Sequence, residues 1–287
     1  VYRFFEADRI HVRGMIISDY SFEYSHWNAI ESLGKWLIDN QVPAIWGIDT
    51  RQVTKIIRER GVMLGKIVID GLPEPPQFID PNKENLVAQV STREVITYGD
   101  GKYTVVLVDC GCKYNIIRCL CKRGAKVIRV PWDYDFTQID YDGLMLSNGP
   151  GDPQQGQATI AHIKKAIALG KPIFGICLGN QLLSIAAGAS TFKLKYGHRS
   201  HNQPALMVGT DRAMITSQNH GFAVDTATLD PEWEPYFINL NDGTSEGIRH
   251  KNKPFFSVQF HPEASGGPVD TEFLFDDFIQ NIEKCTR

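Results

Sequence analysis

The sequence predicts an α/β protein whose C-terminal part is a mostly parallel sheet with helices on both faces, preceded by a small α/β module. From residue 103 onward, short apolar runs alternate with helical patterns, which is typical of such a sheet. Residues 71–101 are instead rich in Pro, Asn, Asp and Gly, as in a linker. We therefore divide the chain into residues 1–98, the N-terminal module with its linker, and residues 99–287, the C-terminal domain.

The N-terminal module reads as a mixture of strands and helices. Residues 12–18 have strand character and residues 27–40 the pattern of an amphipathic helix. A second helix is predicted over residues 50–60, because Asp49 is a good N-cap. Strand character returns at residues 61–70, and the linker after them is expected to wrap a surface with little regular structure.

The C-terminal domain opens with a continuous apolar run at residues 103–109, the mark of a strand covered on both faces. Helices are predicted at residues 115–123, 158–169, 181–187 and 271–284, the first two stopped by Gly124 and Gly170. Further strands are predicted at residues 126–130, 143–147, 172–176, 213–216, 235–240, 247–249 and 255–260. In open α/β sheets, sites form at the carboxyl ends of the strands.

Composition excludes several classes of protein. The formal net charge of −3 and the absence of long basic runs favour neither nucleic acid nor a membrane surface as partner. No apolar run is long enough to cross a bilayer, so we expect a cytoplasmic protein. The six cysteines of such a chain are expected to be free thiols. Two Cys-x-Cys pairs raise the alternative of a zinc site, but Cys119 and Cys121 would point to different faces of a helix, so we expect no metal.

The stretch around Cys177 carries the strongest chemical signal. A strand-like run ends in Gly175-Ile176-Cys177-Leu178-Gly179, and a helix of small residues follows at once. This is the arrangement of a nucleophile elbow, in which glycines permit two backbones to pass closely. We expect Cys177 to be exposed at a helix N-terminus, where the dipole favours the thiolate. The alternative is a buried structural cysteine.

A thiol nucleophile needs a base, and the best candidate is His261. It follows the strand at residues 255–260, and Glu263 lies two residues on, where a carboxylate can orient the imidazole. The loop at residues 148–153 follows a neighbouring strand, and one of its amides, together with the Leu178 N–H, would form an oxyanion hole. The alternative for this loop is a plain Gly-Pro turn.

These motifs, taken together, resemble a known family. The elbow around Cys177 with His261-Pro262-Glu263 is similar to the class I, or triad, glutamine amidotransferases. More narrowly, LSNGPGDP at 146–153, SQNHGFAV at 217–224 and GIDTR at 47–51 resemble the small-chain family of carbamoyl-phosphate synthases. The resemblance runs along nearly the whole chain.

The resemblance implies an enzyme: the glutamine-hydrolysing part of a carbamoyl-phosphate synthase, serving pyrimidine and arginine synthesis. Cys177 would form a γ-glutamyl thioester, with His261 as acid and base and Glu263 as its orienter. The residues implied to hold glutamine are Gly149, Gly151, Leu178, Gln181, Asn219, Gly221 and Phe222. Ammonia would pass through a tunnel to a large synthetase chain. That chain would bind ATP and Mg²⁺, and no cofactor is expected on this one.

The sequence departs from the family pattern in two places. Many relatives carry His at the position of Asn180, where we expect effects on packing or on groups behind the substrate pocket. The family's N-terminal module also begins before the position of Val1 and includes a serine that contacts glutamine. Lys113 is a weaker candidate for the site, and an ordinary surface lysine is the alternative. Two rival functions are an amidase or cysteine peptidase of similar fold and a catalytically silent docking subunit.

Overall fold

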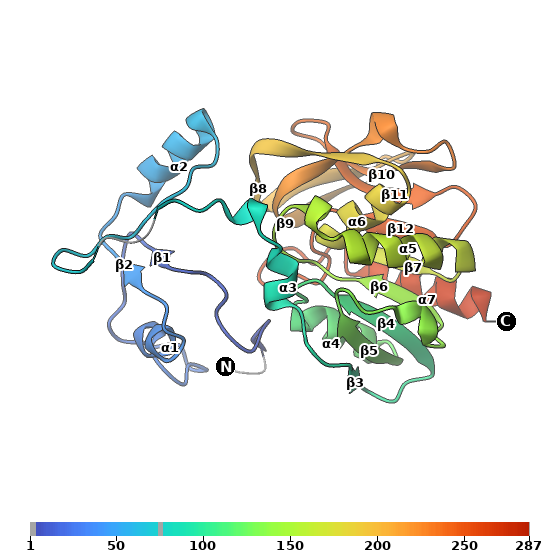
Figure 1. Ribbon diagram of the computed structural model, residues 1–287, viewed down its shortest axis with the longest axis horizontal. Helices are drawn as coiled ribbons and strands as arrows, with labels where there is room; N and C mark the ends of the chain where they lie inside the picture. The colour runs from blue at the N-terminus through green and yellow to red at the C-terminus, as the bar shows by residue number, and fades with distance from the viewer. Residues whose placement is uncertain (1–3, 74–76, 287) are drawn as a thin grey trace. The chain divides into compact units, whose positions relative to one another are not determined.

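The computed structural model describes residues 4–73 and 77–286, so the Glu74–Pro76 part of the predicted linker lies outside the described residues. The chain divides into two compact units, Val1–Asp80 and Pro81–Arg287, called unit 1 and unit 2 below. Our sequence division at residue 98 falls later in the same linker. Figure 1 shows both units, each of which is described by itself.

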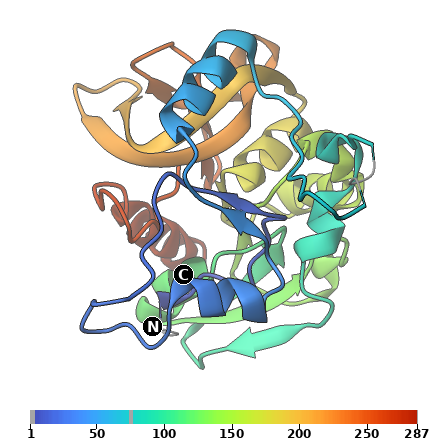
Figure 2. The same cartoon turned by 90° about the vertical axis from the view of Figure 1, so that its left-hand side faces the viewer.

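Unit 1 is built on a two-stranded parallel sheet of β1 (Met15–Ile16) and β2 (Ala44–Ile45) with two helices (Figure 2). Helix α1 (Leu33–Asp39) is capped by Ser32, whose side chain accepts a hydrogen bond from Lys35 N. Helix α2 (Thr50–Arg60) has the predicted bounds, and Asp49 caps it by accepting from Gln52 N at 2.8 Å. Local capping chemistry therefore determines the start of α2.

Three predictions for unit 1 are wrong in extent or kind. The strand at 12–18 shrinks to β1 and the helix at 27–40 to α1, while residues 61–70 form no strand. A strand needs a partner to satisfy its backbone groups, and an apolar run alone does not supply one. The apolar residues at 61–70 therefore stay in irregular structure.

Unit 2 is a ten-stranded sheet in the order β3-β5-β4-β6-β7-β12-β11-β10-β8-β9. The strands from β5 to β12 in this order are parallel, and the others are antiparallel. The parallel strands are β4 (Tyr103–Asp109), β5 (Ala125–Pro131), β6 (Gly143–Leu146), β7 (Ile173–Ile176) and β12 (Phe255–Val258). The antiparallel strands are β3 (Ile96–Tyr98), β8 (Ser190–Met207), β9 (Ala213–Asp225), β10 (Trp233–Asn239) and β11 (Ser245–His250).

Helices cover both faces of this sheet, as predicted. One apolar core joins α4 (Tyr114–Lys122) and α7 (Phe273–Cys285) to one face, with Ile116 and Phe278 fully buried. The other core joins α5 (Gln157–Leu169) and α6 (Leu178–Ala186) to the opposite face, with Ile163 and Leu183 fully buried. Because both faces are dry, the strands between them are continuous apolar runs, which made them visible in the sequence.

The linker contains more regular structure than predicted, since helix α3 (Leu86–Val90) and strand β3 lie within it. Strand β8 was not predicted at all, and β9 continues well beyond the predicted residues 213–216. No helix in the described part of the chain has both the length and the apolar character needed to cross a bilayer.

Candidate active site

Cys177 lies at the sharp bend between β7 and α6. Its φ of 53° is one of two positive values found for non-glycine residues among those described. A Cβ on Gly175 would lie 2.7 Å from Gly179 O, and a Cβ on Gly179 would fall on the carbonyl of Leu146. The two glycines therefore allow the close crossing on which the elbow depends.

The thiol is more enclosed than predicted. Cys177 is 4% exposed, and it belongs to the same apolar cluster as Ile176, Val258 and Phe260. Our expectation of an exposed cysteine was wrong, because the ends of the neighbouring strands pack around the bend. A thiol that is largely shielded from water and lies beside an imidazole suits covalent chemistry.

His261 and Glu263 meet Cys177 because β12 pairs in parallel with β7. The register places Val258 beside Ile176, and Cys177 N donates to Val258 O at 2.8 Å. Cys177 is close enough to His261 to raise the pKa of its imidazole, and His261 Nδ1 lies 2.8 Å from Glu263 Oε1. The structure thus brings together the three residues predicted as a triad.

Lys113 also belongs to this cluster. Its Nζ lies 3.1 Å from Glu263 Oε1 and 3.3 Å from His261 Nδ1. Lys113 directly precedes α4, and its backbone N–H donates to Asn148 Oδ1 at 3.0 Å. The alternative of an ordinary surface lysine therefore does not describe its surroundings.

The charges of this cluster stabilise one another. Burial alone would lower the pKa of His261, but interactions with Glu263 and Cys177 outweigh it and raise that pKa to about 9. Burial would raise the pKa of Glu263, but His261 and Lys113 outweigh it and lower that pKa to about 2. An imidazolium beside a carboxylate is thus favoured, which suits a histidine that must take a proton from a thiol.

The loop after β6 lies against the nucleophile. A Cβ on Gly149 would fall on Cys110 O and would lie 2.8 Å from Leu178 Cδ2, so Gly149 packs directly beside the residue that follows Cys177. Gly151 has a φ of 90° and lies near Leu86 of α3. The loop predicted to supply one oxyanion donor thus lies beside Leu178, the predicted source of the other donor.

Of the residues expected to hold glutamine, Gln181 and Phe222 are in contact. Gln181 Nε2 donates to Phe222 O at 3.1 Å and to Gln259 Oε1 at 3.1 Å. Asn219, Gly221 and Phe222, which the resemblance assigns to the glutamine site, lie within β9. They are strand residues because β9 pairs with β8, with Asn219 opposite Arg199 and a register shift nearby.

A second cluster of ionisable groups lies in the antiparallel half of the sheet. The ligand atoms of His198, His220 and Glu246 lie within 4.8 Å of one another, and all three residues are buried. His198 Nε2 lies 2.9 Å from Asp242 Oδ2, and His220 Nδ1 lies 2.8 Å from Phe222 O. The other two ring nitrogens, His198 Nδ1 and His220 Nε2, lie 3.0 and 3.1 Å from Gln218 Oε1, so the arrangement favours a hydrogen-bonded network.

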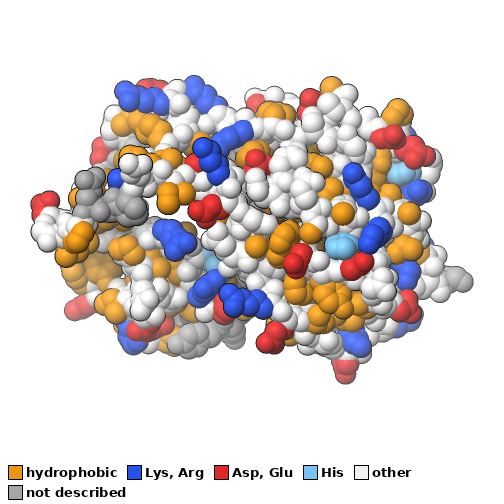
Figure 3. Space-filling model, viewed as in Figure 1, with side chains coloured by type: hydrophobic (Ala, Val, Ile, Leu, Met, Phe, Trp, Pro, Cys, Tyr) orange, Lys and Arg blue, Asp and Glu red, His pale blue; other side chains and the backbone are white. Residues whose placement is uncertain are grey.

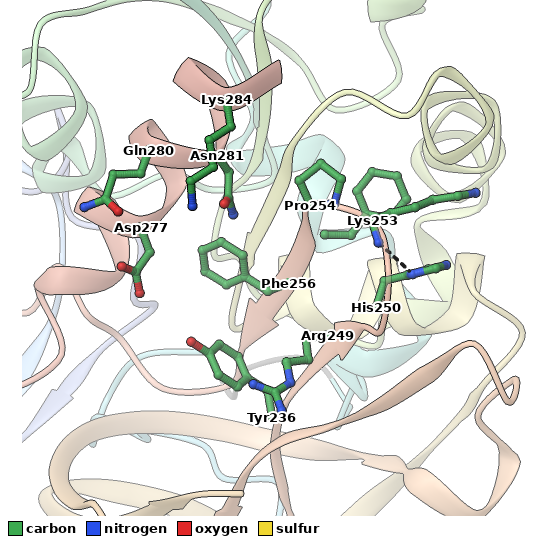
Figure 4. A pocket seen from close by; sticks show the side chains of 11 residues that line it. Tyr236, Arg249, His250, Lys253, Pro254, Phe256, Asp277, Gln280, Asn281 and Lys284 are labelled. Atoms are coloured by element: carbon green, nitrogen blue, oxygen red, sulfur yellow. Dashed lines mark hydrogen bonds between the residues drawn. The ribbon is translucent and has the colours of Figure 1, made fainter. Parts of the chain in front are cut away.

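A cavity of about 320 Å³ lies between α7 and the strands β10–β12 (Figure 4). Lys253, Lys284 and Asp277 line it, and Lys253 N donates to His250 Nδ1 at 3.1 Å. Its wall includes Pro254, which precedes β12, whereas His261 follows the other end of that strand. None of the predicted site residues lines this cavity.

Sequence reasoning missed Gln259 and Ser257 as neighbours of the site. Both are fully buried polar residues on or directly after β12, and both connect to Asn180. The sequence does contain a signal for them, because they are the two polar residues, at alternate positions, in the otherwise apolar run at 255–260.

Two family models match the chain. The model described as glutamine amidotransferase class-I matches residues 106–281. The model described as carbamoyl-phosphate synthase small chain, CPSase domain, matches residues 2–67. The solved structure of a putative GMP synthase subunit from Thermoplasma acidophilum covers 66% of this chain and 98% of its own, with a TM-score of 0.57 and 24% identity, and so supports the fold alone.

Curated relatives match nearly the whole chain. The arginine-specific small chain of carbamoyl phosphate synthase from Saccharomyces cerevisiae is 50% identical, over 98% of this chain and 71% of its own length. The mitochondrial carbamoyl-phosphate synthase [ammonia] of Rattus norvegicus is 52% identical over 98% of this chain, which spans only 19% of that protein. The multifunctional protein CAD of Squalus acanthias is 52% identical over 99% of this chain and 13% of its own length.

Proposed function

Because the chain belongs to the class I glutamine amidotransferases, and within them to the carbamoyl-phosphate synthase small-chain family, we propose that it hydrolyses L-glutamine to glutamate and ammonia. One observation carries the proposal. The pairing of β12 with β7 brings His261 beside Cys177, whose charge acts on the imidazole, and His261 Nδ1 lies 2.8 Å from the buried carboxylate of Glu263.

The first half of the reaction makes a thioester. Since Nδ1 of His261 is engaged by Glu263, Nε2 takes the thiol proton as Cys177 Sγ attacks the carboxamide carbon of glutamine. The oxyanion then receives hydrogen bonds from the Leu178 N–H and from an amide of the Gly149 loop. His261 returns its proton to the leaving nitrogen, and ammonia departs.

The second half releases glutamate. His261 accepts a proton from water, the resulting hydroxide attacks the thioester carbonyl, and the same oxyanion donors stabilise the new tetrahedral intermediate. Collapse of that intermediate breaks the C–S bond and restores the Cys177 thiol. The net reaction consumes glutamine and water and yields glutamate and ammonia.

We propose that the ammonia passes to a large synthetase chain, which unit 1 docks and which binds ATP and Mg²⁺ to make carbamoyl phosphate. Among the described residues of unit 1, Leu37 alone is a buried apolar side chain. Phe22, Trp27 and Trp46 are 71%, 85% and 60% exposed, and Figure 3 shows apolar side chains over the visible face of this unit. Exposed aromatic side chains of this kind are typical of a protein interface.

Two rivals differ in what they require. A catalytically silent docking subunit has one observation in its favour, since the rat relative is named for ammonia. Against it stands the complete cluster of Cys177, His261 and Glu263, with Lys113 beside it. An amidase or cysteine peptidase would need no network around Gln181 to recognise an amino acid head group.

The test traps Cys177 with a glutamine-mimicking electrophile and measures ammonia release from glutamine, with and without the partner chain. We expect labelling and turnover in the wild type and neither in Cys177→Ser. Ammonia release from peptide amides but not from glutamine would favour the peptidase, and neither activity with the partner present would favour the silent subunit.

For localisation, we propose the cytoplasm, on the ground that all six cysteines are free thiols, which suits a reducing compartment. The rat relative is named as mitochondrial. Imaging of the tagged full-length protein distinguishes the two compartments.

A further inference from the structure

A buried row of polar side chains lies directly behind Gln181. Ser257 Oγ donates to Asn180 Oδ1 at 2.8 Å, and Asn180 Nδ2 donates to Gln259 Oε1 at 3.0 Å. Gln259 Oε1 also accepts from Gln181 Nε2 at 3.1 Å. Ser257, Asn180 and Gln259 are 0% exposed and Gln181 is 3% exposed, so water does not compete for these bonds. We call these four side chains the amide row.

One end of the amide row faces a backbone group of fixed polarity. A backbone carbonyl only accepts, so Phe222 O requires the amide nitrogen of Gln181 to face it. The second hydrogen on that nitrogen goes to Gln259 Oε1. Both donors of Gln181 are thereby used, and its Oε1 takes part in none of the hydrogen bonds found among the described residues.

We infer that Asn180 and Gln259 are positioning residues that hold the Gln181 amide with Oε1 toward the substrate, where it accepts a hydrogen bond from an α-ammonium group. This inference rests on the proposed glutaminase function and deepens it. It assigns selection for a free α-amino acid to the amide row. A reversed Gln181 amide would turn its NH₂ toward the ammonium and repel it.

The hydrogen bonds of the amide row leave one donor group of Gln259 unpaired. Gln259 Nε2 is buried and has no hydrogen-bond partner among the described residues. A reversed Gln259 would donate to its neighbours, so its observed orientation depends on Asn180 offering a donor and Gln181 offering a second one. Loss of the donor at residue 180 therefore favours reversal of Gln259.

The chain offers a matched set of variants. Asn180→Leu removes the donor and the acceptor while keeping the branched shape of the side chain, whereas a neutral histidine in Asn180→His supplies one of each. Ser184→Ala is the control, because Ser184 Oγ is buried on the same helix but donates to the backbone carbonyl of Asn180, outside the row. All three variants remove or replace a buried polar group, so a general loss of packing would affect them alike.

The experiment compares glutamine with glutaramate, the same carboxamide without the α-amino group, in the full chain with its partner. In Asn180→Leu we expect a 10- to 100-fold rise in KM for glutamine, a much smaller change in kcat, and a loss of the preference for glutamine over glutaramate. Asn180→His should restore KM to within about threefold, and Ser184→Ala should keep the preference. Labelling of Cys177 by iodoacetamide, which has no amino group, should be equal in all of them.

Three results would overturn the inference. One is an unchanged preference for glutamine in Asn180→Leu. Another is an equal loss of the preference for glutamine over glutaramate in Asn180→Leu, Asn180→His and Ser184→Ala, since that would indicate a general loss of packing. The last is a wild type that hydrolyses no glutamine, which alone among the three also ends the proposed function.

Discussion

At the residue scale, two cations share one oxygen of Glu263. His261 Nδ1 lies 2.8 Å and Lys113 Nζ 3.1 Å from its Oε1, whereas Oε2 is buried with no partner among the described residues. The carboxylate thus has both of its positively charged neighbours on the same oxygen. His261 and Lys113 together keep Glu263 ionised in a place where burial would raise its pKa.

Removing this lysine should therefore weaken catalysis without weakening substrate binding. In Lys113→Met we expect kcat for glutamine hydrolysis to fall about tenfold or more, with KM changed by less than about threefold, because the pKa of Glu263 rises and the imidazolium loses its counter-charge. Steady-state ammonia release measures both constants. Lys165→Met is the control, since Lys165 pairs with Asp135 on the surface. Equal kcat in both variants would contradict the assignment.

The raised pKa of His198 predicts how the stability of the folded state depends on pH. Burial would lower its pKa, but Glu246 and Asp242 raise it to about 9, above the ordinary value of about 6.5. Between these values the folded state binds more protons than the unfolded state. The stabilisation is therefore fully present below pH of about 6.5 and is lost as the pH rises through about 9.

Urea unfolding at a series of pH values tests this. His261 titrates in the same window, so we expect wild-type free energy of unfolding to fall across it with contributions from both histidines, each at most about 1.4 kcal/mol per pH unit. His198→Gln should be less stable at pH 6 and should lose less stability between pH 6 and 9. An identical slope in the variant would show that His198 does not carry the effect.

At the scale of elements, the bend between β7 and α6 is the most demanding piece of backbone. Cys177 occupies a positive φ that its side chain disfavours, and the crossing of β6 over α6 leaves no room for a Cβ on Gly179. Such strain persists only where the surrounding packing enforces it. Here the parallel pairing of β7 with β6 and β12 supplies that packing.

Gly179→Ala should consequently both destabilise the fold and stop turnover. The added methyl would fall on Leu146 O, and we expect a loss of about 2 kcal/mol or more in the free energy of unfolding. Urea unfolding and ammonia release measure the two effects. Gly266→Ala is the matched control, because nothing lies within 4 Å of its added Cβ, and its stability should change by less than about 1 kcal/mol.

Elements with local signals were predictable and elements that depend on distant partners were not. Strand β4 and helix α2 have the predicted bounds, because an apolar run and an N-cap are both read from neighbouring residues. Strand β8 escaped prediction because its polar, Gly- and Pro-containing sequence becomes a strand only by pairing with β9 and β10. The apolar residues at 61–70 show the converse, since no strand in the described residues pairs with them.

The residues of the site also divide into those with local sequence signals, which were predictable, and those that depend on distant partners, which were not. The elbow at Cys177 and the strand-terminal His261 were visible because glycine spacing and strand ends are local features. The amide row was not, because Asn180 and Gln259 meet only when β12 docks beside β7 and α6. Lys113 remained ambiguous for the same reason, since its partner Glu263 is distant in the sequence.

At the scale of the whole molecule, the two units differ in how they are stabilised. Unit 2 has a dry core on each face of its sheet. Unit 1 has Leu37 as its single buried apolar side chain among the described residues, and the side chains of α2 are all at least partly exposed. Folding stability follows buried apolar area, so unit 1 should open more readily.

Hydrogen exchange measures this difference directly. In the isolated chain we expect amides of α2 to exchange far faster than those of β4 and β7, by about 100-fold or more. Adding the large partner chain should slow exchange in unit 1 and leave β4 unchanged. Equal protection of both units in the isolated chain would refute the assignment of stability to unit 2.

The neighbouring positions of β7 and β12 also have a meaning for synthesis on the ribosome. The general base and its carboxylate directly follow β12, whereas the sulfur follows β7, which lies much earlier in the chain. A nascent polypeptide, or one cut short by a premature stop, carries the reactive thiol without the groups that activate it. The thiol thus gains its base and the carboxylate behind that base only after β12 has been synthesised and has paired with β7.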